Sequence, residues 1–226
     1  DQLAAHYQSQ NLPVVLVEQG TVNPLGDRYS RFWQAHKSGT AYYPLVIIDS
    51  GLRYTQGPRD YYNDWKAMID EELARPAQAQ FEVYGRRDGD AYWAGGRLTN
   101  LSGDTLSGAG NAAAITLLVY EEARVGVTGR YVRAAAHEAI ATPLAPGASV
   151  DFTLQSGPLS GVNWDKVHAL VLVDYLPQGY SGAYDMLQAA TPLPLSVTVS
   201  PTSLRFMVDP ARPGEVAQQL TIEAPS

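Results

Sequence analysis

The sequence predicts an α/β half, then an all-β half, then the opening strands of a further β module. Two uninterrupted aliphatic runs, at residues 14–17 and 45–48, are typical of strands covered on both faces. Amphipathic helical patterns surround these runs, whereas short alternating runs separated by turn residues fill the chain after Pro76. A stiff Thr-Pro-Leu-Pro stretch at residues 191–194 suggests a linker. We therefore divide the chain into residues 1–77, 78–191 and 192–226.

Composition excludes several classes of function. The chain has 226 residues, 45% of them hydrophobic, so it is long enough to build substantial cores. Its net charge of −7, without a basic block, argues against binding to nucleic acid or to an anionic membrane surface. It has no cysteine, which excludes thiol redox chemistry, thiolate nucleophiles and metal–thiolate sites. No apolar run is long enough to span a membrane, and no signal peptide is recognisable.

The α/β half is expected to contain six elements in the order helix, strand, helix, strand, strand, helix. Leu3 and Tyr7 share one face of the first helix, Asp27 caps the second, and Pro76 follows the last. The short Ser50-Gly51 sequence predicts a two-residue turn and therefore an antiparallel hairpin. The six expected elements are residues 1–11, 14–17, 27–39, 45–49, 52–56 and 59–75.

This order of elements resembles a thioredoxin-like fold from its first helix onward. Tyr43-Pro44 supports the resemblance, because an aromatic-proline bond at the start of a strand favours a cis isomer. The first strand of that fold and its Cys-x-x-Cys turn are absent. The missing strand would lie in the middle of the sheet. Either residues upstream of Asp1 or another segment of the chain must therefore fill its place.

The all-β half is expected to form an immunoglobulin-like sandwich without a disulfide. Its most apolar strands, at residues 113–121 and 167–175, should lie centrally in their sheet. The seven expected strands are residues 80–86, 92–100, 113–121, 129–136, 149–155, 167–175 and 184–190. Beyond them, residues 195–201, 203–206 and 216–223 alternate as strands of a partial further sandwich would.

A family resemblance joins the first two parts. The sandwich contains Leu117–Glu122, Tyr131–Ala135, Val171–Asp174 and Met186–Ala190. A thioredoxin-like half followed directly by a sandwich with these strands resembles a family of bacterial outer-membrane lipoproteins, over about residues 1–191. The resemblance implies an exported envelope or surface protein with a role in adhesion or binding. Without cysteines, it implies no redox activity for any residue of this chain.

Aromatic side chains are the candidate binding residues. In an active thioredoxin-like protein, Tyr43 and Pro44 would flank a peptide groove, but without the cysteine turn a fixed bend at the start of a strand is the simpler interpretation. Flat aromatic rings also bind sugars and peptide side chains, although such residues more often pack one domain against another. The complete candidate set is Tyr42, Tyr43, Pro44, Tyr54, Tyr61, Tyr62 and Trp65.

Other chemistry has little support in the sequence. The four histidines show no metal-ligand spacing, and no nucleotide-binding glycine motif or Gly-x-Ser-x-Gly elbow occurs. Asp49 and Asp60 offer carboxylates, and Glu121 and Glu122 should point to opposite faces of a strand. Asn100-Leu101-Ser102 is a formal glycosylation site. We expect no catalytic residue, no metal and no cofactor.

The expected function is therefore a non-catalytic, exported bacterial binding, adhesion or scaffold protein of the cell envelope, with a protein or glycan partner. Two alternatives stay open. One is a thiol oxidoreductase whose active cysteines lie upstream of Asp1. The other is a carbohydrate-binding module that uses the Tyr- and Trp-rich face. Nucleic acid and nucleotides are not expected partners. The sequence identifies neither a ligand nor an oligomeric state.

Overall fold

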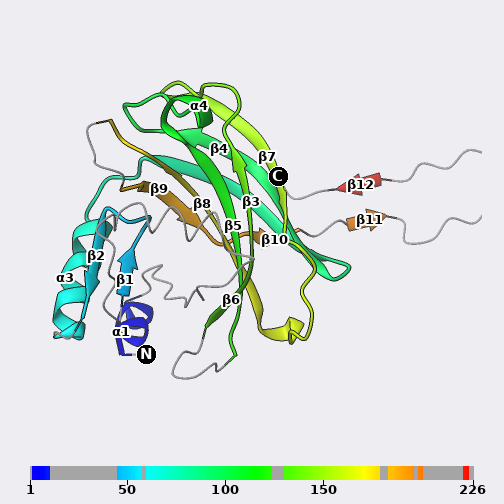
Figure 1. Cartoon of the computed structure of the whole chain (residues 1–226). Helices are drawn as coiled ribbons and strands as arrows, with labels where there is room; N and C mark the ends of the chain where they lie inside the picture. Colours follow the sequence, from blue (N-terminus) through cyan, green and yellow to red (C-terminus); the bar gives the residue numbers. More distant parts are fainter. Residues whose placement is uncertain are drawn as a thin grey trace, which may run out of the picture.

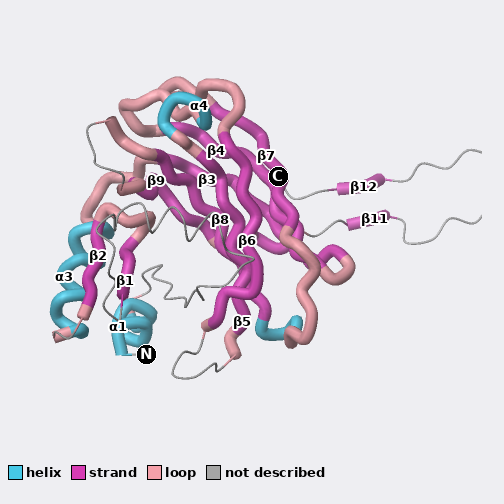
Figure 2. Tube along the Cα trace, in the orientation of Figure 1, coloured by secondary structure: helices cyan, strands magenta, loops and turns pink. Residues whose placement is uncertain are grey.

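The computed structural model describes residues 2–10, 45–57, 60–123, 130–178, 183–195, 198–200 and 221–223. Strands dominate these residues, and helices are few (Figures 1 and 2). The expected strand at 14–17, the expected helix at 27–39, the expected strand at 203–206, and Tyr42, Tyr43 and Pro44 all lie outside them. Among the described residues, no helix combines the length and apolar character that crossing a membrane requires.

A β-sandwich forms the larger part of the molecule (Figure 1). One four-stranded sheet has the order β10-β3-β4-β7, and the other has the order β6-β5-β8-β9. The predicted seven strands are confirmed with small shifts at their ends. Their bounds are β3 (Ala79–Asp88), β4 (Ala91–Asn100), β5 (Ala114–Glu121), β6 (Tyr131–Ala139), β7 (Ser149–Gln155), β8 (Val167–Tyr175) and β9 (Asp185–Ala190).

The apolar core lies between the two sheets. It draws fully buried side chains from both, including Leu98 of β4, Leu117 of β5 and Val171 of β8. The prediction that β5 and β8 lie centrally is confirmed, because each pairs with a strand on either side. Every residue of β5 is buried, so this strand is covered on both faces of its sheet. A second apolar cluster, which contains Leu118 and Leu172, lies on the outer face.

Gly96 of β4 shows how closely the strands approach one another. A Cβ at this position would lie 1.9 Å from the carbonyl oxygen of Glu82 on β3. No other residue type fits there unless the two backbones separate. The short segments between strands add α4 (Gly108–Asn111), a single helical turn, and η1 (Trp164–Lys166), a 3₁₀ turn before β8.

A smaller helix–hairpin unit lies beside β9 (Figure 1). It consists of α1 (Gln2–Ser9), β1 (Leu45–Ile48), β2 (Arg53–Gln56) and α3 (Tyr61–Leu73). Its small core contains Leu3, Tyr7, Ile48 and Ile69. The predicted amphipathic face of α1 is therefore confirmed. The hairpin and α3 are confirmed too: β1 and β2 pair antiparallel, and Asp60 caps the helix.

Two details of the hairpin were predicted wrongly. Ile48 pairs with Arg53, so residues 49–52 form a four-residue loop instead of a two-residue turn at Ser50-Gly51. The cause is a left-handed backbone at Asp49, where φ is 58°. The strand at 45–48 is also less covered than predicted, because Val46 and Ile47 are only half-buried.

The stretch expected to be a linker contributes to the sandwich. β10 (Leu193–Pro194) pairs parallel with β3, and the backbone amide of Leu195 donates to the carbonyl of Gly85. This part of the chain is therefore an edge strand. Farther on, β11 (Thr198–Ser200) and β12 (Thr221–Glu223) pair antiparallel, within two of the stretches that alternate in the sequence.

Candidate functional site

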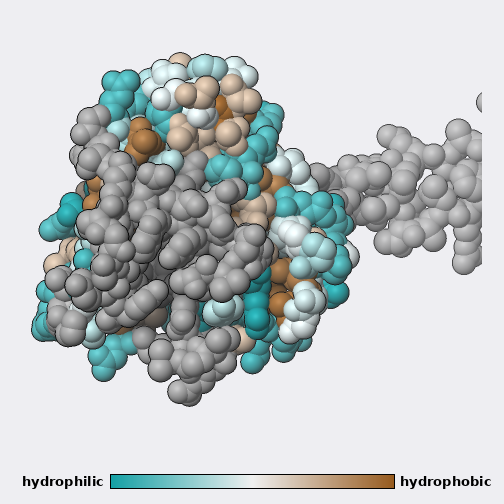
Figure 3. Space-filling view, viewed as in Figure 1, coloured by the Kyte–Doolittle hydropathy of each residue, from teal (hydrophilic) through white to brown (hydrophobic). Residues whose placement is uncertain are grey.

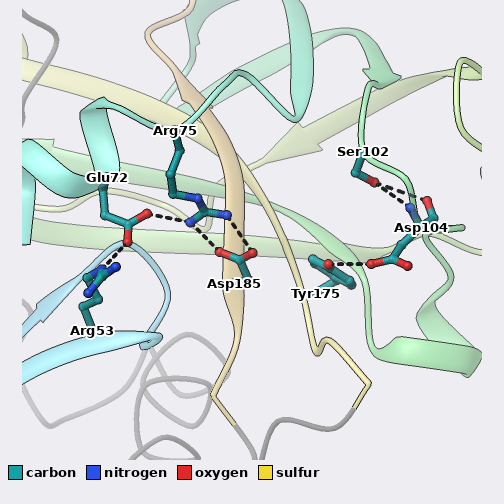
Figure 4. Close-up of polar contacts among 7 residues, drawn as sticks. All are labelled: Arg53, Glu72, Arg75, Ser102, Asp104, Tyr175 and Asp185. Carbon is teal, nitrogen blue, oxygen red and sulfur yellow. Dashed lines mark hydrogen bonds and ion pairs between the residues drawn. The ribbon is translucent and has the colours of Figure 1, made fainter.

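The most concentrated group of charged side chains lies where the helix–hairpin unit meets the sandwich (Figure 4). Arg75 follows the end of α3, and its guanidinium makes a two-pronged contact with Asp185, the first residue of β9. Both nitrogen–oxygen distances are 2.8 Å. Planar guanidinium and carboxylate groups match one another in this geometry, which makes the contact both strong and directional. The pair ties the end of α3 to the sandwich.

Glu72 of α3 extends the group toward the hairpin. One carboxylate oxygen accepts from Nη1 of Arg75 at 2.5 Å, and the other accepts from Nε of Arg53 on β2 at 2.6 Å. The Glu72 side chain is only 8% exposed. Burial raises its pKa, but the hydrogen bonds from Arg75 and Arg53 outweigh burial and bring the pKa below the ordinary value. Glu72 is therefore an anion held between two cations.

Asp49 is the remaining member of the group, and its protonation differs. Its half-buried side chain stands in the hairpin loop and hydrogen-bonds the carboxylate of Glu72. Burial raises the pKa of Asp49 to about 7, and the neighbouring charges of Glu72 and Asp185 add to this effect, although Arg75 opposes it. A carboxyl group next to a carboxylate retains its proton and donates it in a hydrogen bond.

We call Asp49, Arg53, Glu72, Arg75 and Asp185 the junction cluster. Its three carboxyl groups face two guanidinium groups, so the charges balance when Asp49 is protonated. Glu71 also contacts Arg53, at 2.6 Å, but its side chain is 58% exposed and contributes little in water. The arrangement can hold or release one proton near neutral pH and can fasten three elements together.

The four aromatic candidates that the structure describes do not form one face. Trp65 of α3 donates its indole N–H to the hydroxyl of Thr55 on β2 at 2.8 Å. Successive residues of a strand point to opposite sides, so Tyr54 faces away from α3 and is 41% exposed. The ring of Tyr61 lies against Trp65, with centroids 5.0 Å apart, and Tyr62 packs on the small core of the unit. Helix packing therefore accounts for Tyr62 and Trp65, while Tyr54 lies on the other side of β2.

The carboxylates considered from the sequence have structural partners. Asp60 caps α3 through the backbone amide of Asn63, at 3.4 Å. Glu121 is buried and accepts from the backbone amide of Asn163 and from Arg133, whereas Glu122 is exposed and contacts Arg130. The prediction that the two glutamates point apart is therefore confirmed.

The structure also bears on the glycosylation motif and on metal binding. Asn100 is fully buried, and its amide nitrogen donates to the carbonyls of Asp104 and Leu144, which makes it inaccessible to glycosylation in the folded chain. Where the structure describes the chain, it shows no group of three or more His, Asp or Glu side chains that could hold a metal ion.

Sequence reasoning missed most of the junction cluster. Glu72 and Arg75 are three residues apart near the end of a predicted helix, which is a usable sign of a local ion pair. Nothing local indicates Asp185, which is 110 residues from Arg75. No protein-family model matches the chain, and no curated protein matches its sequence. A functional argument therefore has to start from these residues.

Proposed function

We propose that this protein is a non-catalytic binding or scaffold module, exported to the bacterial cell envelope. In this proposal a thioredoxin-like part is fastened to an immunoglobulin-like sandwich. The proposal rests on the contacts that the charged side chains of the junction cluster make. The cluster joins α3, the hairpin and β9 by direct contacts at 2.5–2.8 Å, so these groups hold the two parts in one arrangement.

The order of the strands supports the immunoglobulin-like part. Counted from β3, the first, second and fifth strands share one sheet, and the third, sixth and seventh share the other, as in immunoglobulin domains. The fourth strand, β6, differs. It pairs with the third strand here, whereas in the constant type it lies in the sheet of the first. Many cell-surface domains share this architecture without sharing the same topology or sequence.

The surface of the described residues supports a role in binding. Hydrophobic residues visible on one face of the molecule lie in small, separate areas among hydrophilic ones (Figure 3). Among the described residues, the exposed large apolar side chains come from different elements or segments: Tyr54, Leu73, Leu101 and Leu193. Exposed aromatic and aliphatic side chains suit contacts with a protein or glycan partner.

The location of the full-length protein in its native cells tests the export part. Intact cells would be treated with a membrane-impermeant amine reagent, and the modification of the protein would be compared with that in lysed cells. The proposal predicts strong modification in intact cells. Modification only after lysis would contradict it.

A second experiment tests binding by the helix–hairpin unit. The purified protein and its Tyr54→Ala variant would be titrated onto an array of immobilised envelope glycans and peptides. Tyr54→Ala should reduce any captured signal several-fold, because large aromatic anchors carry much of the binding energy of a contact. Arg97→Gln is the matched control, since Arg97 is also an exposed strand residue but belongs to the sandwich. Equal loss in both variants, or capture by neither protein, would reject a binding role for this unit.

A further inference from the structure

The hairpin loop contributes two contacts to the junction, one through its backbone and one through the carboxyl group of Asp49. Gly51 forms a parallel β-bridge with Tyr184, the residue just before β9. Asp49, two residues earlier, hydrogen-bonds Glu72 at the end of α3. A left-handed backbone at Asp49 turns the chain between these two contacts. Because the contacts are so close along the chain, a change in one is transmitted directly to the other.

The charged groups around Asp49 come from each element that meets at the loop. α3 contributes Glu72, the segment after it contributes Arg75, and β9 contributes Asp185. Glu72 and Asp185 are anions, and Arg75 already contacts both of them. Arg53 of β2, the other cation of the junction cluster, contacts Glu72. Arg75 is therefore already engaged by two carboxylates before Asp49 ionises, and it opposes the raised pKa of Asp49 only in part.

From this geometry we propose that the junction cluster is a pH-dependent latch. The helix–hairpin unit is fastened to the sandwich while Asp49 and Glu72 share a proton, and it loosens when Asp49 loses that proton. The latch goes beyond a binding or scaffold role, because it makes the arrangement of the two parts depend on acidity.

The loosening follows from charge and hydrogen bonding. Loss of the proton removes the hydrogen bond from Asp49 to Glu72 and leaves two anions side by side in a partly dry site. Arg75 must then be shared by Asp49, Glu72 and Asp185, which weakens its two-pronged contact with Asp185. The loop and the end of α3 separate to relieve the repulsion. This separation weakens the β-bridge between Gly51 and Tyr184.

The direction of the pH dependence follows from proton counts. The folded state retains the Asp49 proton up to about pH 7, whereas the unfolded chain releases it near its ordinary value of 3.8. Between these values the folded state binds more protons, so this group makes the fold less stable as the pH rises. Above about pH 7 its contribution is constant, because both states have then lost the proton.

Hydrogen exchange on the full chain tests the latch. The Asp49→Asn variant keeps an N–H donor for Glu72 and cannot ionise, and asparagine also tolerates a left-handed backbone. Wild type and variant would be compared at the same pH, which cancels the intrinsic change of exchange rate. At pH 8 the amides of residues 51–55 and 184–186 should exchange about tenfold faster in wild type than in the variant. At pH 5.5 the two proteins should agree within about twofold.

Two comparisons keep this test decisive. The amides of β5 and β8 should show no such difference, so an equal pH effect there would mean a global loss of stability and would overturn the latch. Asp151→Asn is a matched control, because Asp151 pairs with an arginine on the exposed face of the sandwich. If the Asp49→Asn variant does not fold, hydrogen exchange of the wild type alone still tests the latch. Its residues 51–55 must lose protection relative to β5 between pH 5.5 and 8, and constant relative protection would reject the proposal.

Discussion

Glu121 in the sandwich and Asp49 at the junction are both withdrawn from water, yet their proton affinities shift in opposite directions. The backbone amide of Asn163 lowers the pKa of Glu121; burial raises it, but Arg133 adds to the lowering and the net shift is downward. The pKa of Asp49 is raised to about 7 by burial and by the negative charges of Glu72 and Asp185. Burial alone therefore does not decide the charge of a carboxyl group. The donors that the fold supplies decide it.

The same contrast applies to the two regions as wholes. The sandwich is held by apolar packing between two paired sheets, and its buried Glu121 has dedicated donors. The helix–hairpin unit has a small core and joins the sandwich through a cluster in which carboxyl groups outnumber guanidinium groups. The sandwich should therefore respond mainly to changes of volume, and the junction should respond mainly to changes of charge.

The largest expected effect is in the sandwich core. Leu117→Ala removes a fully buried side chain between the sheets and should reduce the free energy of unfolding by about 3 kcal/mol. Urea denaturation at pH 6 and pH 8 measures the loss, which should be the same at both values because no charge changes. A loss below about 1 kcal/mol would mean that the core can collapse around the cavity.

Arg75→Met tests the junction and should cost about 2 kcal/mol, because it leaves Glu72 and Asp185 buried without their shared cation. The double variant with Asp185→Asn should lose less than the sum of the two single variants, by about 1 kcal/mol or more. Additive losses would show that the two-pronged contact contributes nothing to stability. Since Arg75 lowers the pKa of Asp49, its removal should also shift the titration of Asp49 upward.

Glu121→Gln should cost about 1.5 kcal/mol at neutral pH, because the amide loses the charge-assisted hydrogen bond with Arg133. A carboxylate with a lowered pKa stabilises the fold above its unfolded pKa and stops doing so as the pH falls. The difference in the free energy of unfolding between wild type and the Glu121→Gln variant should therefore shrink below about pH 4.

Asp49→Asn should have the opposite effect on the free energy of unfolding and stabilise the protein at pH 8. If both variants changed the free energy of unfolding in the same direction at pH 8, the contrast between Glu121 and Asp49 would be wrong.

The smallest effect is expected at the exposed pair of Arg97 and Asp151. Their side chains are 55% and 72% exposed, so Arg97→Gln should leave the free energy of unfolding nearly unchanged. The effect should vanish in 1 M salt, where charges this exposed are screened. A salt-independent loss would instead indicate that the arginine side chain packs on β4 or β7.

The sequence was sufficient for the strands of the sandwich and insufficient for the junction. Alternating runs and uninterrupted apolar runs located all seven strands, because burial on one or two faces leaves a pattern in consecutive residues. The hairpin loop was predicted wrongly because a left-handed aspartate is not readable from Asp-Ser-Gly alone. The linker at 191–194 proved to be partly an edge strand, since proline is tolerated at sheet edges.

The candidate site was predictable only in part. Asp49 was considered as one of several carboxylates, but its neighbours come from α3 and from β9, which are far from it in the sequence. The aromatic residues of α3 were recognised as packing or binding residues, and the contact of Trp65 with Thr55 favours packing. Long-range ion pairs leave no local pattern, and 110 residues separate the two ends of the central one.

The titration of the Asp49 carboxyl group is the most decisive measurement for the proton-dependent junction. The ¹³C chemical shift of this carboxyl would be followed from pH 3 to pH 9 in the full-length, folded protein, with Asp151 as an internal reference. We expect a midpoint near 7 for Asp49 and a midpoint below the ordinary value of 3.8 for Asp151. A midpoint near 4 for Asp49 would mean that it is ionised beside Glu72 at neutral pH, and the proton-dependent junction would then be wrong.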